Sequence, residues 1–165
     1  MTTSSRIIFV GLVALALALA PQPARAQNVS YSIYVGGVSL YCRSYFGEPV
    51  AIMVDHAADG SIGVASRSFN GQPYMVLGPG YLNRVPALAA QFWFLHECAH
   101  HALPPNMNNE PNADCFAVRN LRDLGLVWDL YQLQGMLQSI YVLPGSHSHL
   151  PGPARAQHIY NCLNS

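Results

Sequence analysis

The feature that most constrains the fold is a long apolar stretch, residues 86–103, that stops at two consecutive prolines. Proline lacks the amide hydrogen that a helix needs, and it forces the preceding residue out of helical backbone space, so Pro104 and Pro105 must end the segment. The stretch contains Phe92, Trp93 and Phe94 in succession. It therefore predicts a deeply buried helix, around which the rest of the chain must pack.

The segments on either side of this helix differ in character. The preceding residues are rich in Val, Ile and Tyr, and Asp59-Gly60 and Asn70-Gly71 are dipeptides that favour tight hairpins. We expect strands near Ser30–Val35, Val50–His56, Ile62–Ser66 and Tyr74–Leu77. After it, three more helices are expected near 109–124, 127–141 and 153–163, the first with Asn109 as cap, Pro111 in the first turn and Gly125 at its end. The fold class is α+β, a small and mostly antiparallel sheet followed by four helices.

The N-terminus resembles a secretory signal peptide. A short start with one positive charge precedes 14 apolar residues, Ile7–Ala20, and the segment closes with Ala24-Arg25-Ala26. A membrane anchor is the alternative, but 14 residues span about 21 Å as a helix, whereas a bilayer core is about 30 Å thick. We expect residues 1–26 to be removed, leaving a single domain, 27–165, that does not span a membrane and lies in the periplasm or outside the cell.

Charge and composition exclude two classes of protein. Eight Arg balance eight Asp plus Glu, and only 10% of the residues are charged, so a protein that binds nucleic acid by neutralising phosphates is not expected. A hydrophobic fraction of 51% excludes an intrinsically disordered chain.

Export changes the interpretation of the four cysteines, which are Cys42, Cys98, Cys115 and Cys162. An oxidising compartment favours disulfides, and four cysteines allow three pairings that the sequence does not distinguish. A thiolate metal site would need clustered thiols such as Cys-x-x-Cys, which this sequence lacks. The sequence therefore predicts two disulfides.

The buried helix carries the residues most suited to chemistry. His96 and His100 are four residues apart, so both imidazoles project from one helix face and can bind a single zinc ion. Glu97, about 100° round the helix, can reach a water on that ion and act as general base. The alternative is that the histidines are hydrogen-bonded core residues, but a buried Glu among histidines needs partners, which a metal supplies.

The next predicted helix offers a third ligand. Glu110 and Asp114 are also four apart, and the intervening residues are long enough for this helix to turn back on the first. We expect Glu110 to bind the metal and Asp114 to accept a hydrogen bond from a ligand histidine. The alternative is that these acids only favour a helix N-terminus, and His101 is another candidate ligand.

These paired motifs support a resemblance to a known family. His-Glu-Cys-Ala-His (96–100) followed by Glu-Pro-Asn-Ala-Asp (110–114) resembles the pattern of gluzincin metallopeptidases, particularly the group with the CAAX prenyl proteases and soluble minimal gluzincins. His149 and Arg155, six residues apart, are similar to the later His and Arg of that group.

The resemblance implies a zincin-type active-site helix followed by a ligand helix. It implies one zinc ion bound by His96, His100 and Glu110, with Glu97 as the base and Asp114 in support. It also suggests that His149 and Arg155 lie near the substrate or the transition-state oxyanion.

The leading hypothesis is therefore an exported zinc metalloendopeptidase acting on a protein or peptide. A catalytically silent, zinc-stabilised envelope module is the alternative, and a metal-free structural domain is a third. Met75–Leu77 is either an edge strand that aligns substrate or an ordinary core strand. His147 and His149, as His-x-His, are either metal ligands in a loop or solvated loop residues.

Overall fold

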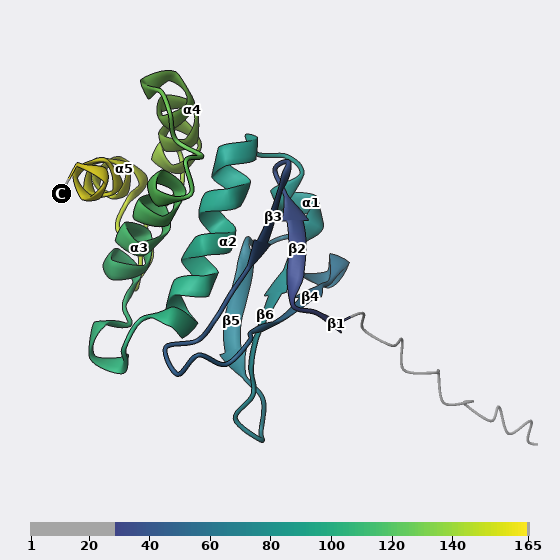
Figure 1. Cartoon of the computed structure of the whole chain (residues 1–165). Helices are drawn as coiled ribbons and strands as arrows, with labels where there is room; N and C mark the ends of the chain where they lie inside the picture. Colours follow the sequence, from purple (N-terminus) through teal and green to yellow (C-terminus); the bar gives the residue numbers. More distant parts are fainter. Residues whose placement is uncertain (1–28, 165) are drawn as a thin grey trace, which may run out of the picture.

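The computed structural model describes residues 29–164 (Figure 1). The predicted signal peptide, with cleavage after Ala26, lies outside these residues. Within them the chain is α+β, as predicted: the strands come first and the helices follow. No helix in the described part of the chain is long and apolar enough to cross a membrane.

The main sheet has four strands and is mostly antiparallel, as predicted. Its order is β1 (Val29–Ser30), β4 (Ala51–Val54), β6 (Pro73–Leu77) and β5 (Gly63–Arg67). Strand β6 pairs parallel with β4 and antiparallel with β5. A separate antiparallel hairpin is formed by β2 (Ser32–Val35) and β3 (Val38–Tyr41).

The two turn dipeptides behave differently. Asn70-Gly71 lies in the β5–β6 connection as expected, and Gly71 adopts a positive φ of 83°. Asp59-Gly60 was expected to close a hairpin, but β4 and β5 do not pair. The Asp59 carboxylate instead accepts the amide hydrogen of Gly80, which holds this loop against the start of α1 (Pro79–Leu82).

Two strand predictions need correction. The expected strand Ser30–Val35 is interrupted at Tyr31, and the chain then forms the β2–β3 hairpin, which was not predicted. Gly36 and Gly37 connect these strands with positive φ at both residues, a conformation that glycine adopts without steric cost. The strand expected to reach His56 ends at Val54, because the Asp55 side chain accepts from the amide of Ala57 and caps a short 3₁₀ turn.

The helices follow the predicted order. The apolar stretch forms α2 (Ala87–Ala102), and Leu103 is extended as expected before Pro104. The others are α3 (Glu110–Asp123), α4 (Leu130–Tyr141) and α5 (Gly152–Leu163), with a 3₁₀ turn at Pro105–Met107. Helix α4 begins three residues later than predicted, because the Asp129 side chain caps it by accepting from the amide of Gln132.

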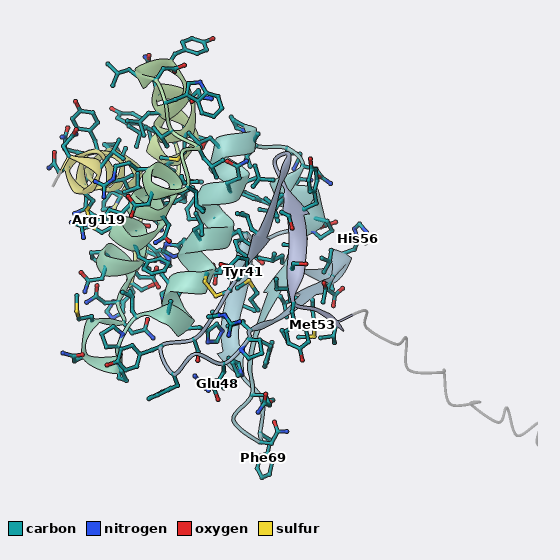
Figure 2. All side chains as sticks on the ribbon, in the orientation of Figure 1. Tyr41, Glu48, Met53, His56, Phe69 and Arg119 are labelled. Atoms are coloured by element: carbon teal, nitrogen blue, oxygen red, sulfur yellow. A yellow bond between two sulfur atoms is a disulfide. The ribbon has the colours of Figure 1, made fainter. Side chains whose placement is uncertain are left out.

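Helix α2 occupies the middle of the molecule (Figure 1). The main sheet and the β2–β3 hairpin lie on one side of it, and α3, α4 and α5 lie on the other. Phe92, Trp93 and Phe94 are at most 1% exposed, which confirms the deeply buried helix. In contrast, Phe69 is fully exposed at the tip of the β5–β6 connection (Figure 2).

Two disulfides join these layers, as the sequence predicts. Cys42–Cys98 connects the residue after β3 to α2, and Cys115–Cys162 connects α3 to α5. The first fixes the residue between Glu97 and Ala99 of α2, and the second fixes the residue next to Asp114 of α3. Both links therefore hold segments that carry candidate site residues.

Candidate metal centre

Three imidazoles converge on one carboxylate. Glu110, the first residue of α3, has its Oε2 atom 3.1 Å from Nε2 of His96 and 2.9 Å from Nε2 of His149. Its other oxygen, Oε1, lies 3.7 Å from Nε2 of His100. The abrupt return of the chain after Pro104 thus brings the start of α3 against the histidine face of α2.

The two histidine rings of α2 are oriented by contacts at Nδ1, on the side of each ring that faces away from Glu110. Nδ1 of His96 lies 2.9 Å from Oδ1 of Asp114, and Nδ1 of His100 lies 2.9 Å from Oδ1 of Asn108. Each contact favours the tautomer with a hydrogen on Nδ1 and leaves the Nε2 lone pair facing Glu110, the arrangement in which histidine ligates a metal.

His149 comes from the loop between α4 and α5 and is oriented in the same way. Its Nδ1 lies 2.9 Å from the hydroxyls of both Ser146 and Ser148. Its Nε2 therefore faces the same carboxylate as the two helix histidines. His147, in the same loop, is exposed.

The contacts at Glu110 fit a bound cation. Oε2 is buried, and two imidazole nitrogens lie 2.9 and 3.1 Å from it. Two ligands at 2.0–2.1 Å from a tetrahedral zinc ion are separated by about 3.3 Å, close to the spacings found here. Ligand atoms of His96, Glu110 and His149 lie within 4.8 Å of one another, so these three residues could hold a metal ion. His100, the other expected ligand, lies outside this group, with its Nε2 atom 3.7 Å from Oε1 of Glu110.

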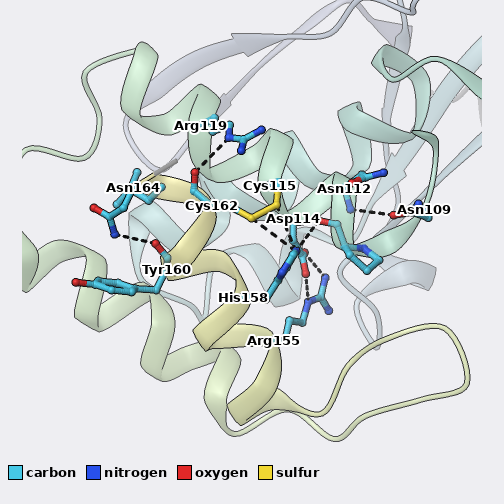
Figure 3. The surroundings of a disulfide bond; sticks show 12 residues. Asn109, Asn112, Asp114, Cys115, Arg119, Arg155, His158, Tyr160, Cys162 and Asn164 are labelled. Atoms are coloured by element: carbon cyan, nitrogen blue, oxygen red, sulfur yellow. Dashed lines mark hydrogen bonds and ion pairs between the residues drawn. A yellow bond between two sulfur atoms is a disulfide. The ribbon is translucent and has the colours of Figure 1, made fainter. Parts of the chain in front are cut away.

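Arg155 lies behind His96, away from the cavity. Its guanidinium donates two hydrogen bonds to the carboxylate of Asp114, at 2.8 and 2.7 Å (Figure 3). It also stacks over the ring of Trp93, with Cζ 4.8 Å from the ring centroid. At 4% exposed, it does not line the cavity that contains the histidines. The structure therefore brings Arg155 to Asp114, where it fixes the residue that orients His96, and not to a substrate position.

Glu97 occupies the opposite side of the centre. It is buried, and Gly63 of β5 lies so close that a Cβ there would be 3.2 Å from the Glu97 side chain. Burial raises the pKa of Glu97, although His96, His100 and the amide of Ala65 favour its charged form. A buried carboxyl group with a raised pKa is suited to exchanging protons with a nearby water.

The pKa values of the two acids of α3, Glu110 and Asp114, are lowered. Contact with His96 lowers the pKa of Glu110 in spite of partial burial. Burial would raise the pKa of Asp114, but its hydrogen bonds with His96 and Arg155 outweigh that effect and lower it. Burial likewise opposes charge on His96, yet Asp114 and Glu110 leave its pKa raised.

His101, the alternative ligand, faces elsewhere. Its Nε2 donates to the carbonyl of Tyr74 in β6 at 2.9 Å, and burial lowers its pKa. It belongs to neither of the potential metal-binding groups of the described residues. Its contact joins α2 to the sheet.

The centre lies in an open cavity of about 790 Å³. Strand β5, from Gly63 to Arg67, lines one wall together with Glu97, whose side chain packs against this strand, and the three histidines and Glu110 line the other wall. Strand β5 is the edge strand of the described sheet, whereas Met75 and Leu77 of β6 are fully buried between β4 and β5. Of the two readings of Met75–Leu77, the structure therefore supports the core strand.

Comparison with models of protein families, with curated proteins and with solved structures finds no match for this chain. The interpretation of the site accordingly depends on its own geometry.

Some site residues were not found from the sequence. Asn108, Ser146 and Ser148 orient histidines through single hydrogen bonds, and Gly63 admits the Glu97 side chain. Small polar residues are common in loops, so their presence in the sequence does not identify them as partners of histidines. Asn108 is the exception, because the short connection between Pro104 and Glu110 keeps it near the end of α2, where His100 lies.

Proposed function

We propose that this chain is an exported zinc-dependent peptidase. The observation that carries the proposal is the convergence of Glu110 with His96, His100 and His149, while Glu97 faces the same cavity with a raised pKa. A zinc ion bound there would lower the pKa of a coordinated water and polarise a substrate carbonyl.

The residues of the chain divide the remaining work. Glu97 takes a proton from the attacking water and passes it to the leaving amine, which is the role of a general base and then a general acid. His96, His100 and Glu110 supply the ligands, and Asp114 with Arg155 fixes the ring of His96.

Strand β5 supports a peptide as substrate. It is an edge strand that lines the cavity, so its free backbone groups can pair with an extended chain. An unfolded segment laid along the outer edge of β5 would cross the cavity between the wall of β5 and Glu97 and the wall of the histidines and Glu110. The two disulfides suit a chain that folds in an oxidising compartment after export.

The test uses the chain from Gln27 to Ser165, purified and loaded with one equivalent of zinc. We expect cleavage of unfolded protein or of a peptide library, loss of cleavage after chelation, and recovery when zinc is restored. In Glu97→Gln, cleavage should fall by at least about 1,000-fold with zinc still bound. Equal activity in this variant would refute the assigned base.

A catalytically silent zinc module is the second candidate, favoured by the position of His149. With His149 as a ligand, three imidazoles and one carboxylate would close the coordination shell, as in structural zinc sites. X-ray absorption would then count three imidazoles, and no unfolded substrate would be cleaved. A peptidase requires an open coordination position on the zinc ion for water. If His149 blocks that position only in the absence of substrate, His149→Ala would raise cleavage or leave it unchanged.

A further inference from the structure

A second cluster of ligand atoms connects α3 to α5. Nε2 of His158 lies 3.3 Å from Sγ of Cys115 and 3.6 Å from Sγ of Cys162 (Figure 3). His158 and Cys162 are one helical turn apart on α5, and Cys115 faces them from α3. All three ligand atoms lie within 4.8 Å of one another.

We propose that Cys115, His158 and Cys162 form a second metal site, which binds a thiophilic divalent cation such as zinc when their disulfide is reduced. Two thiolates and one imidazole are a ligand set typical of zinc and cobalt, and the fourth position would be taken by water. This set differs chemically from the imidazoles and carboxylate around Glu110. The proposal is independent of peptidase activity.

The disulfide and the metal are alternative states of the same cross-link. A dithiol reductant passes two electrons to the disulfide and becomes a cyclic disulfide itself, while its two protons go to the sulfurs of Cys115 and Cys162. Binding of the cation then displaces these two protons, because thiolates are the ligands. His158 changes tautomer in this step: in the disulfide form Nε2 donates to the carbonyl of Pro111 at 3.0 Å, and as a ligand it needs a free lone pair there.

The helices stay in place without the disulfide, because other contacts join them. Arg119 and Arg122 of α3 donate to the carbonyls of Cys162 and Leu163 at 3.2 and 3.0 Å. Ile159 of α5 is fully buried in the core. The Cα atoms of Cys115 and Cys162 are 5.1 Å apart. Under the proposal, both side chains rotate after reduction, so that the two sulfurs separate and an ion enters between them.

The experiment titrates cobalt(II) into the full mature chain before and after reduction by a trialkylphosphine, which competes weakly for metal. Expected after reduction are one additional equivalent of cobalt and a new near-ultraviolet band from thiolate-to-cobalt charge transfer. Circular dichroism on the same samples reports whether the helices remain folded. Glu110→Gln should leave the band unchanged, which separates this site from the first.

Matched variants identify the ligands. Cys115→Ser should abolish the band, and His158→Gln should weaken cobalt binding at least about tenfold. Replacing Cys42 and Cys98 by Ser should preserve the band, because that pair has no place in the cluster. The proposal is overturned if reduction adds no thiolate band, if the band survives Cys115→Ser, or if the reduced chain unfolds and cobalt does not refold it.

Discussion

The acids on the two sides of the metal centre have pKa values that are shifted in opposite directions. On the α3 wall, Glu110 and Asp114 each face an imidazole, and Asp114 also faces a guanidinium, so the pKa values of both acids are lowered. On the β5 wall, Glu97 is buried against backbone, forms no ion pair with the described residues at contact distance, and has a raised pKa.

This difference separates two chemical tasks. A carboxylate that holds a cation must remain charged, which nearby positive groups ensure. A carboxylate that moves protons needs a raised pKa, which burial provides when it outweighs the groups that favour the charged form. Under the proposed function, Glu110 would hold the cation and Glu97 would move protons, and the following predictions test that assignment.

The largest effect is expected on the α3 wall. Asp114→Ala leaves the guanidinium of Arg155 buried without its carboxylate, which should cost about 3–5 kcal/mol of unfolding free energy. Zinc binding should also weaken by about 10–100-fold, because His96 loses its orienting partner. Urea unfolding and competition titration measure the two losses.

The matched control is the double variant Asp114→Ala, Arg155→Met, which removes both charges and should recover part of the stability. If Asp114→Ala costs less than about 1 kcal/mol, the buried pair does not organise this wall.

Glu110→Gln should separate binding from proton transfer. Loss of the anionic ligand is expected to raise the zinc dissociation constant by about 100-fold, or about 2.7 kcal/mol. Glu97→Gln, on the other wall, should leave that constant within about threefold. Competition with a chromophoric chelator measures both, and an equal loss in the two variants would erase the distinction between the walls.

Local rules in the sequence predicted the parts of this centre that lie on one helix. Helical spacing puts His96 and His100 on one face, and the proline pair ends α2, so these features do not depend on the rest of the fold. The cap at Asn109 and the end of α3 were likewise readable from single residues.

The parts that depend on tertiary packing were not predictable. The parallel pairing of β4 with β6 and the loss of the Asp59-Gly60 hairpin follow from contacts between distant segments. The position of Arg155 was unpredictable for the same reason. Its spacing from His149 in the sequence does not determine on which side of His96 it lies. The packing of α5 on α3 brings it to Asp114.

Acid should weaken the α3 wall. The pKa values of Asp114 and Glu110 are lower in the folded state than their ordinary values of 3.8 and 4.5. Their contribution to stability is therefore complete above those ordinary values and is lost as the pH falls through the folded pKa values. The melting temperature of the metal-free chain should drop by roughly 5 °C between pH 5 and pH 3. The melting temperature of Asp114→Asn should fall less over the same pH range. An equal fall in the two proteins would mean that groups other than Asp114 cause the sensitivity to acid.

The smallest expected effect is the contribution of Glu97 to the stability of the metal-free chain. Its pH dependence has the opposite sign to that of Asp114 and Glu110. Because its folded pKa lies above the ordinary 4.5, stability is greatest below that value and decreases as the pH rises through the folded pKa. Glu97→Gln removes the buried charge, so its melting temperature at pH 8 should exceed that of the unchanged chain by about 3 °C. The two should coincide below pH 4.5. Calorimetry across this range tests the sign. A destabilised Glu97→Gln at pH 8 would mean that the Ala65 amide and the two histidines outweigh the cost of burying the charged carboxylate.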